Sequence, residues 1–197
     1  ELLFRDTVSS DAISVTRLGR DDRPERVLRR GRLLGEIEQL AGRLASRGLA
    51  GRPVLIPERN GLEYVVAFLA CLRAGCMAVT AHPPRAGGGG ERLAAIVRNS
   101  RPAAVIAGEE MSKSLDRLAS DLFEGVDRIS CGKFGTSVTE ESSSSIASSS
   151  PDASIPWPDP ASIGLLQYTS GSTRDPAPVA ITQANLLANG LAMRDLF

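Results

Sequence analysis

Apolar residues in the first 131 positions recur with helical spacing in some segments and form short continuous runs in others. The clearest helical set has intervals of four, three and four residues and consists of Leu33, Ile37, Leu40 and Leu44. Gly48 follows as a stop signal. Residues 53–57 form an apolar run bounded by prolines, which is typical of a buried strand. The pattern therefore predicts a helix from about residue 33, followed by a strand.

The alternation of strands and helices continues downstream. Residues 62–74 are apolar nearly all round, so we expect a buried helix there. Asn60 and Glu63 are predicted to form a capping box at its start, and Gly75 is predicted to end it. A later helix is predicted to be capped by Ser112. Further strands are predicted at 12–18, 76–81, 103–107, 126–130 and 179–181, and further helices around 93–97 and after Thr182.

The repeated order of strand and helix favours an α/β fold, with a mostly parallel sheet flanked by helices on both faces. We divide the chain into an α/β subdomain at 1–131, a Ser/Pro-rich flexible segment at 132–160, and a stretch at 161–197 that completes the subdomain with a strand, a loop and a helix. The middle segment has seven serines between Ser142 and Ser150, and it buries too little apolar surface to offset chain entropy. Trp157 is expected to hold the end of this segment against the surface.

The candidate functional residues follow the apolar run that begins at Leu165, where the sequence changes to hydroxyl residues and a glycine. In open parallel sheets, ligands gather beyond the carboxyl ends of the strands, and hydroxyl groups with backbone N–H groups bind phosphate there. An ordinary Ser/Thr-rich turn explains the same composition equally well. The candidate phosphate-binding residues are Thr169, Ser170, Gly171, Ser172 and Thr173.

The amino-acid composition limits which partners the chain is expected to bind and in which cellular compartment it is expected. The chain has 23 basic and 23 acidic residues, and this balance argues against binding to nucleic acid or an anionic membrane. No apolar run reaches the roughly 18–20 residues of a membrane span. Three cysteines without a Cys-x-x-Cys pair fit a reducing, cytoplasmic setting. Without an initiator methionine or a signal segment, the chain is expected to be an internal or trimmed piece.

Two other chemistries have less support. A Ser-His-Asp hydrolase would have to use His82, the single histidine, and the sequence has no nucleophile elbow. A nicotinamide-binding domain would rest on the glycines at 87–90, with Glu109 or Glu110 on the ribose, but no Gly-x-Gly-x-x-Gly pattern fits there. A flexible linker explains these glycines better.

Several segments resemble one family. Residues 166–173 are similar to the phosphate-binding signature of adenylate-forming (AMP-binding) ligases, and Gln167-Tyr168 resembles the fatty acyl-AMP ligase branch. Residues 61–75, 81–85 and 91–97 also resemble that branch, so the likeness covers most of 33–189. It implies the N-terminal subdomain of a ligase that uses ATP and Mg²⁺ to activate a fatty acid as acyl-adenylate. The product would pass to an acyl carrier protein, as in polyketide or lipopeptide biosynthesis.

The resemblance also implies what this chain lacks. Family members place the adenine contacts, the magnesium carboxylate and the lid lysine beyond the position of Phe197, so the remaining C-terminal part of the ligase is an expected partner. We therefore assign no catalytic or metal-binding residue here, and we do not expect this part to be active alone.

The likeness stops after Thr173. The family continues with Gly-x-Pro-Lys-Gly, whereas here residues 174–178 read Arg-Asp-Pro-Ala-Pro. Loss of the lysine is expected to weaken phosphate binding by about ten-fold or more unless Arg174 takes its place, so Arg174 joins the candidate residues. The alternative is a catalytically inactive member of the family that serves as an interaction or lipid-binding domain.

Overall fold

Six strands form the central sheet in the computed structural model, which describes residues 13–18, 24–84, 90–132, 136–137, 155–168 and 176–196. Their spatial order is β6-β5-β3-β4-β8-β9. The first five of these strands run parallel, and β9 pairs antiparallel with β8. The predicted mostly parallel sheet is therefore confirmed. In chain order the strands are β3 (Pro53–Ile56), β4 (Met77–Thr80), β5 (Ala104–Ala107), β6 (Asp127–Ser130), β8 (Ile163–Tyr168) and β9 (Pro178–Thr182).

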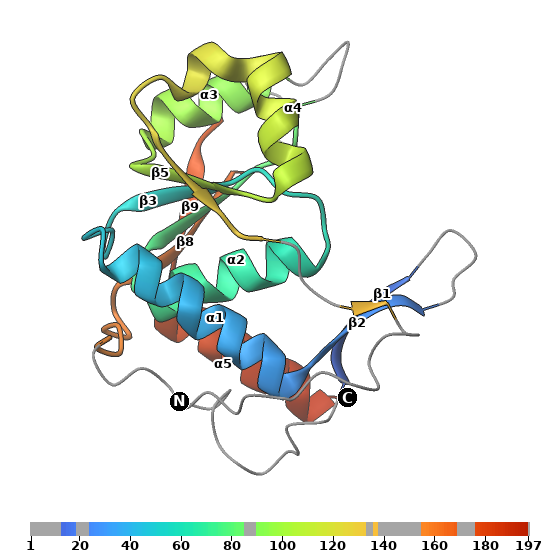
Figure 1. The fold of residues 1–197 in the computed structure, drawn as a ribbon. Helices are drawn as coiled ribbons and strands as arrows, with labels where there is room; N and C mark the ends of the chain where they lie inside the picture. Colours follow the sequence, from blue (N-terminus) through green and yellow to red (C-terminus); the bar gives the residue numbers. More distant parts are fainter. Residues whose placement is uncertain are drawn as a thin grey trace.

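Helices cover both faces of this sheet, as the sequence pattern predicted (Figure 1). One face carries α1 (Arg30–Ala45), α2 (Leu62–Arg73) and α5 (Gln183–Leu196), and the other carries α3 (Gly90–Ser100) and α4 (Glu109–Ala119), which continues into the 3₁₀ helix η2 (Ser120–Phe123). None of the helices in the described part of the chain combines the length and apolarity needed to cross a bilayer.

The core is split into two layers by the sheet. On β3, Val54 and Ile56 face the layer under α1 and α2, whereas Leu55 faces the layer under α3 and α4, and all three side chains are fully buried. A strand that is buried on both faces needs apolar residues at every position, which explains the continuous run at 53–57. The predicted apolar stripe of α1 lies in the first layer and consists of Leu33, Ile37, Leu40 and Leu44.

Two predicted helix starts are wrong. The N-cap of α2 is Gly61 rather than Asn60, and Glu63 faces Arg26 at 3.5 Å instead of closing a capping box. The N-cap of α4 is Gly108, so Ser112 lies inside the helix. In the second case the Gly108 N–H donates to the Glu58 carboxylate at 2.5 Å. Glu58, two residues beyond β3, thus accepts the N–H of the N-cap residue, and the helix begins earlier than predicted.

A smaller antiparallel sheet lies outside the central one. It contains β1 (Ile13–Leu18), β2 (Pro24–Arg29) and the two-residue β7 (Thr136–Ser137), in the order β1-β2-β7. The strand predicted at 12–18 therefore exists and pairs with the next segment of the chain. The division of the chain at 131 and 160 stays a proposal.

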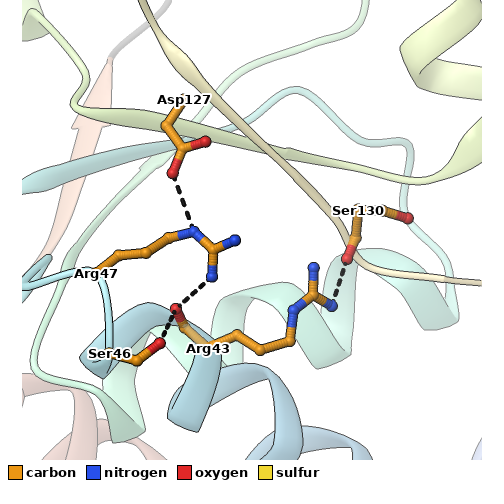
Figure 2. Close-up of polar contacts among 5 residues, drawn as sticks. All are labelled: Arg43, Ser46, Arg47, Asp127 and Ser130. Atoms are coloured by element: carbon orange, nitrogen blue, oxygen red, sulfur yellow. Dashed lines mark hydrogen bonds and ion pairs between the residues drawn. The ribbon is translucent and has the colours of Figure 1, made fainter.

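The last turn of α1 is tied to the edge strand β6 by polar contacts (Figure 2). The Arg43 guanidinium donates to the Ser130 carbonyl at 2.8 Å, and Arg47 donates to Asp127 at 3.1 Å. Arg47 and Ser46 also donate to the Arg43 carbonyl, at 2.9 and 3.1 Å. These contacts join the end of the helix to both ends of β6.

A second arginine contacts the chain where the Ser/Pro-rich segment ends. Arg73, at the end of α2, forms a buried ion pair with Glu38 of α1 at 2.8 Å. The same guanidinium donates to the carbonyls of Ile155 and Pro156 at 3.1 and 3.4 Å. It also lies 4.2 Å from the centre of the Trp157 ring, a cation–π contact. Trp157 thus contacts the α1–α2 layer shortly before β8 begins.

Candidate functional site

The carboxyl ends of the parallel strands meet at one edge of the sheet. After β3 the chain enters α2 on one face, whereas after the neighbouring β4 it enters α3 on the opposite face (Figure 1). This divergence of consecutive helices is the topological switch point at which open α/β sheets bind ligands. β8 lies directly beside β4, with Gln167 opposite Thr80. The segment that follows β8 therefore starts next to the switch point.

The candidate residues Thr169, Ser170, Gly171, Ser172, Thr173 and Arg174 lie outside the described residues, so their role stays a prediction. Both flanks are described. Tyr168 ends β8 and lies opposite Pro178, where β9 begins. The candidate segment thus joins an inner parallel strand to the antiparallel edge strand. After β9, Thr182 caps α5 as predicted, because its hydroxyl accepts the Asn185 N–H at 3.1 Å.

Tyr168 is held by α3 at both of its ends. Its hydroxyl donates to the side-chain oxygen of Asn99 at 2.6 Å, and its carbonyl accepts from Arg92 at 3.4 Å. Desolvation raises the pKa of Tyr168, and a hydrogen bond with Ser100 offsets part of the rise. Sequence reasoning missed Arg92 and Asn99. Their separation of seven residues, two helical turns, is the one signal that they share a helix face.

Glu58 is a further polar residue at this edge of the sheet that the sequence analysis missed. It follows the end of β3 by two positions and accepts the Gly108 N–H. Desolvation is the main cause that raises the pKa of Glu58 above its ordinary value of 4.5, and the charge of Glu63 adds to it, whereas the Gly108 bond lowers it. A carboxylate just after a buried strand was the available signal.

The raised pKa of Glu58 predicts a pH dependence of stability. The folded chain binds this proton more tightly than the unfolded chain, so the contribution of Glu58 is fully present below pH 4.5 and is lost as the pH rises through the raised pKa. Glu58→Gln keeps the acceptor for Gly108 but does not titrate. In urea unfolding from pH 4 to 7, we expect the free energy of unfolding of wild type to fall relative to this variant. The exposed Glu124→Gln serves as control, and a constant or rising difference would contradict the assignment.

The three cysteines, Cys71, Cys76 and Cys131, are buried and form no disulfide. Desolvation, together with the charges of Glu58 and Glu63, raises the pKa of Cys131 to about 12. The pKa of Cys71 is raised well above its ordinary value by a hydrogen bond with Cys76 and by burial. The thiols of Cys71 and Cys131 stay protonated near neutral pH, so thiolate chemistry is not expected from these two residues.

A resident metal site does not fit the described residues. Across the described ranges, no group of three or more histidine, cysteine, aspartate or glutamate side chains could hold a metal ion. His82, the centre of the hydrolase alternative, is exposed and follows β4, with Pro83 and Pro84 buried next to it. The polar residues that the structure describes at this edge of the sheet include Glu58, Arg92 and Tyr168.

Comparison with known proteins identifies relatives that match most of the chain. The model of the family "AMP-binding enzyme" matches residues 26–197. A long-chain-fatty-acid–AMP ligase, FadD26 of Mycobacterium marinum, is 35% identical over 150 residues, which is 76% of this chain and 24% of the relative. A 4-hydroxyphenylalkanoate adenylyltransferase of the same organism is 30% identical over 150 residues, again 76% of this chain and 23% of the relative. The chain therefore spans about a quarter of the length of these relatives.

A solved structure of a related protein has a similar fold. The fatty acyl-adenylate ligase of L. pneumophila, in complex with acyl adenylate and pyrophosphate, superposes with a TM-score of 0.68 at 30% identity. The match covers 90% of this chain and 28% of the ligase chain. The resemblance to fatty acyl-AMP ligases that the sequence showed is thereby confirmed, as is the fold of their N-terminal region.

Proposed function

The chain belongs to the family of AMP-binding enzymes, and from this premise we propose that it forms the phosphate-binding part of an ATP-dependent fatty acyl-AMP ligase. The observation that carries the proposal is the position of the candidate segment. β8 is an inner strand beside the switch point, and the chain leaves its carboxyl end directly into the hydroxyl residues at 169–173. The ligase names of the relatives support a fatty acid as the second substrate.

In the proposed reaction, one oxygen of the fatty acid carboxylate attacks the α-phosphorus of ATP. The bond between the α-phosphorus and the bridging oxygen breaks, and its electron pair leaves with pyrophosphate. Donors fixed around the β- and γ-phosphates stabilise the charge that develops on this leaving group. We assign this role to Thr169, Ser170, Ser172 and Thr173, while Gly171 allows close approach of the backbone.

Arg174 is proposed as the cation of this loop. The family's lysine position is occupied here by Ala177, which is exposed just before β9. Arg174 lies three residues earlier, within the segment itself, and its guanidinium offers charge-assisted bonds to phosphate. Magnesium bound to the phosphates would offset part of their negative charge, and the family likeness implies that its carboxylate ligand lies in the C-terminal part of the ligase.

The later steps are proposals that rest on the family likeness. The acyl group of the adenylate would pass to an acyl carrier protein, in polyketide or lipopeptide biosynthesis, within the cytoplasm. The remaining C-terminal part of the ligase would supply the adenine pocket and the lid.

Exchange of labelled pyrophosphate into ATP tests the proposed reaction. The experiment uses the longest protein that carries this chain, with fatty acids of short, medium and long chain and with a 4-hydroxyphenylalkanoate as separate arms. We expect exchange that depends on a fatty acid. Exchange with the aryl acid alone would redirect the substrate assignment, and no exchange with any acid would remove the enzymatic proposal.

An inactive family member is the second candidate, and the alanine at position 177 favours it. Without the lysine, a loop that has lost its affinity for phosphate would leave a fold for protein interaction or lipid binding. Titration with magnesium ATP separates the two proposals. Binding that weakens on Thr173→Ala supports the ligase, whereas no detectable binding supports the inactive member.

A further inference from the structure

Tyr168 is the last described residue before the candidate segment, so whatever fixes it also fixes where that segment starts. On the β4 side, the ladder of β8 ends one residue earlier, at Gln167 opposite Thr80. On the β9 side, the residue opposite Tyr168 is Pro178, which has no N–H to donate. The Tyr168 carbonyl therefore takes its hydrogen bond from a side chain.

That side chain is Arg92, in the first turn of α3, whose Nη2 donates to the Tyr168 carbonyl oxygen at 3.4 Å. The opposite end of the same residue is also anchored, because the Tyr168 hydroxyl donates to Asn99 at 2.6 Å. Arg92 and Asn99 are seven residues apart, about 10 Å along the helix axis. Two anchors at this separation fix both the position and the direction of the last residue of β8.

Burial strengthens the arrangement. Tyr168 is 9% exposed and packs in the core layer under α3 and α4, together with Leu93 and Ile96 of α3. Helix α3 thus contacts the end of β8 through apolar packing and through hydrogen bonds to both the carbonyl and the hydroxyl of Tyr168. In contrast, Arg98 on the same helix is exposed. The chain therefore offers a matched control on α3 itself.

We propose that Arg92 is a positioning residue for the phosphate-binding segment, because it holds the backbone carbonyl from which that segment departs. This inference rests on the proposed function, since the segment at 169–174 must bind ATP phosphates for its position to affect ATP. Arg92 acts through Tyr168 and the backbone, and it does not itself contact the substrate. Loss of this bond releases the Tyr168 carbonyl, and we expect it to lower the fraction of molecules ready to bind ATP.

Two readouts test this role in the longest protein that carries the chain. The first is amide hydrogen exchange of residues 169–175 in Arg92→Gln, Arg92→Lys and the control Arg98→Gln. We expect exchange to be faster by about three- to ten-fold in Arg92→Gln, less so in Arg92→Lys, and unchanged in Arg98→Gln. The same exchange rate in Arg92→Gln and Arg98→Gln would overturn the proposal.

The second readout is the KM for each substrate in the exchange reaction. We expect Arg92→Gln to raise the KM for ATP by about three- to ten-fold and to leave the KM for the fatty acid unchanged. Both KM values rising together, with a lower thermal midpoint, would mean a structural role and would overturn the proposal. If Arg92→Gln does not fold, Arg92→Lys and Tyr168→Phe replace it, and Tyr168→Phe should have the smaller effect because the carbonyl anchor remains.

The outcomes separate this inference from the function on which it rests. A wild-type protein that binds no ATP removes the ligase proposal, yet the amide exchange of 169–175 still decides whether Arg92 holds the segment. Conversely, a wild-type protein that exchanges pyrophosphate and is unaffected by Arg92→Gln keeps the ligase proposal and removes the positioning role.

Discussion

Replacing Arg73 by methionine is expected to lower the free energy of unfolding by about 3–5 kcal/mol. The side chains of Arg73 and Glu38 are only 3% and 6% exposed, and the guanidinium is the ion-pair partner of the carboxylate at 2.8 Å. Without it, the buried Glu38 carboxylate would lose this ion-pair partner. The carbonyls of Ile155 and Pro156 would also lose a donor each. Urea unfolding of the chain measures the loss.

The exposed pair between Arg47 and Asp127 provides the matched control. Its atoms approach to 3.1 Å, but the side chains are 40% and 48% exposed. Water screens such a pair, so Arg47→Met should cost less than about 1 kcal/mol. The double variant Arg73→Met/Glu38→Met should recover part of the stability lost in Arg73→Met, because no charge is then left buried. Equal losses at Arg73 and Arg47 would contradict the importance of burial.

Replacing Arg174 by alanine is expected to weaken ATP binding by about ten-fold or more, because a charge-assisted hydrogen bond contributes roughly 1.5–3 kcal/mol. Arg174→Lys keeps the charge and should lose less. Calorimetric titration with magnesium ATP, in the longest protein that carries the chain, measures each dissociation constant.

A lysine introduced at position 177 tests whether Arg174 has taken over the role of the family's lysine, three positions away. Ala177→Lys places an ammonium group where the family has its lysine, and in the Arg174→Ala background it should restore most of the lost affinity. Val179→Lys adds the same charge two residues later, at a position that is 49% exposed on β9, and it should restore little. Equal rescue by both lysines would indicate a general effect of charge, and unchanged affinity in Arg174→Ala would contradict its role.

Local patterns predicted most of the sheet and its helices. The apolar stripe of α1 faces the core because its spacing matches the helical turn, and β3 is buried on both faces as its continuous apolar run predicted. Helix α2 has no exposed residue along 62–73, in agreement with its apolar composition. These features depend on neighbours in the sequence, so the sequence was sufficient to predict them.

Contacts between distant segments were not predictable from local patterns. The acceptor for the Gly108 N–H at the start of α4 is Glu58, 50 residues earlier, and Arg73 pairs with Glu38 across 35 residues. The contact between Arg92 and Tyr168 spans 76 residues. A single charged residue in a sequence does not show which backbone group it will meet after folding. The candidate site was therefore found from its motif, whereas the residues that support it required the structure.

The central claim is that the segment leaving β8 binds the phosphates of ATP. Amide hydrogen exchange with and without magnesium ATP, followed on peptides that cover 163–182, tests it most directly. Bound ATP should slow exchange at residues 169–175 and leave β9 nearly unchanged. ATP that binds without protecting 169–175, or that does not bind at all, would contradict the claim.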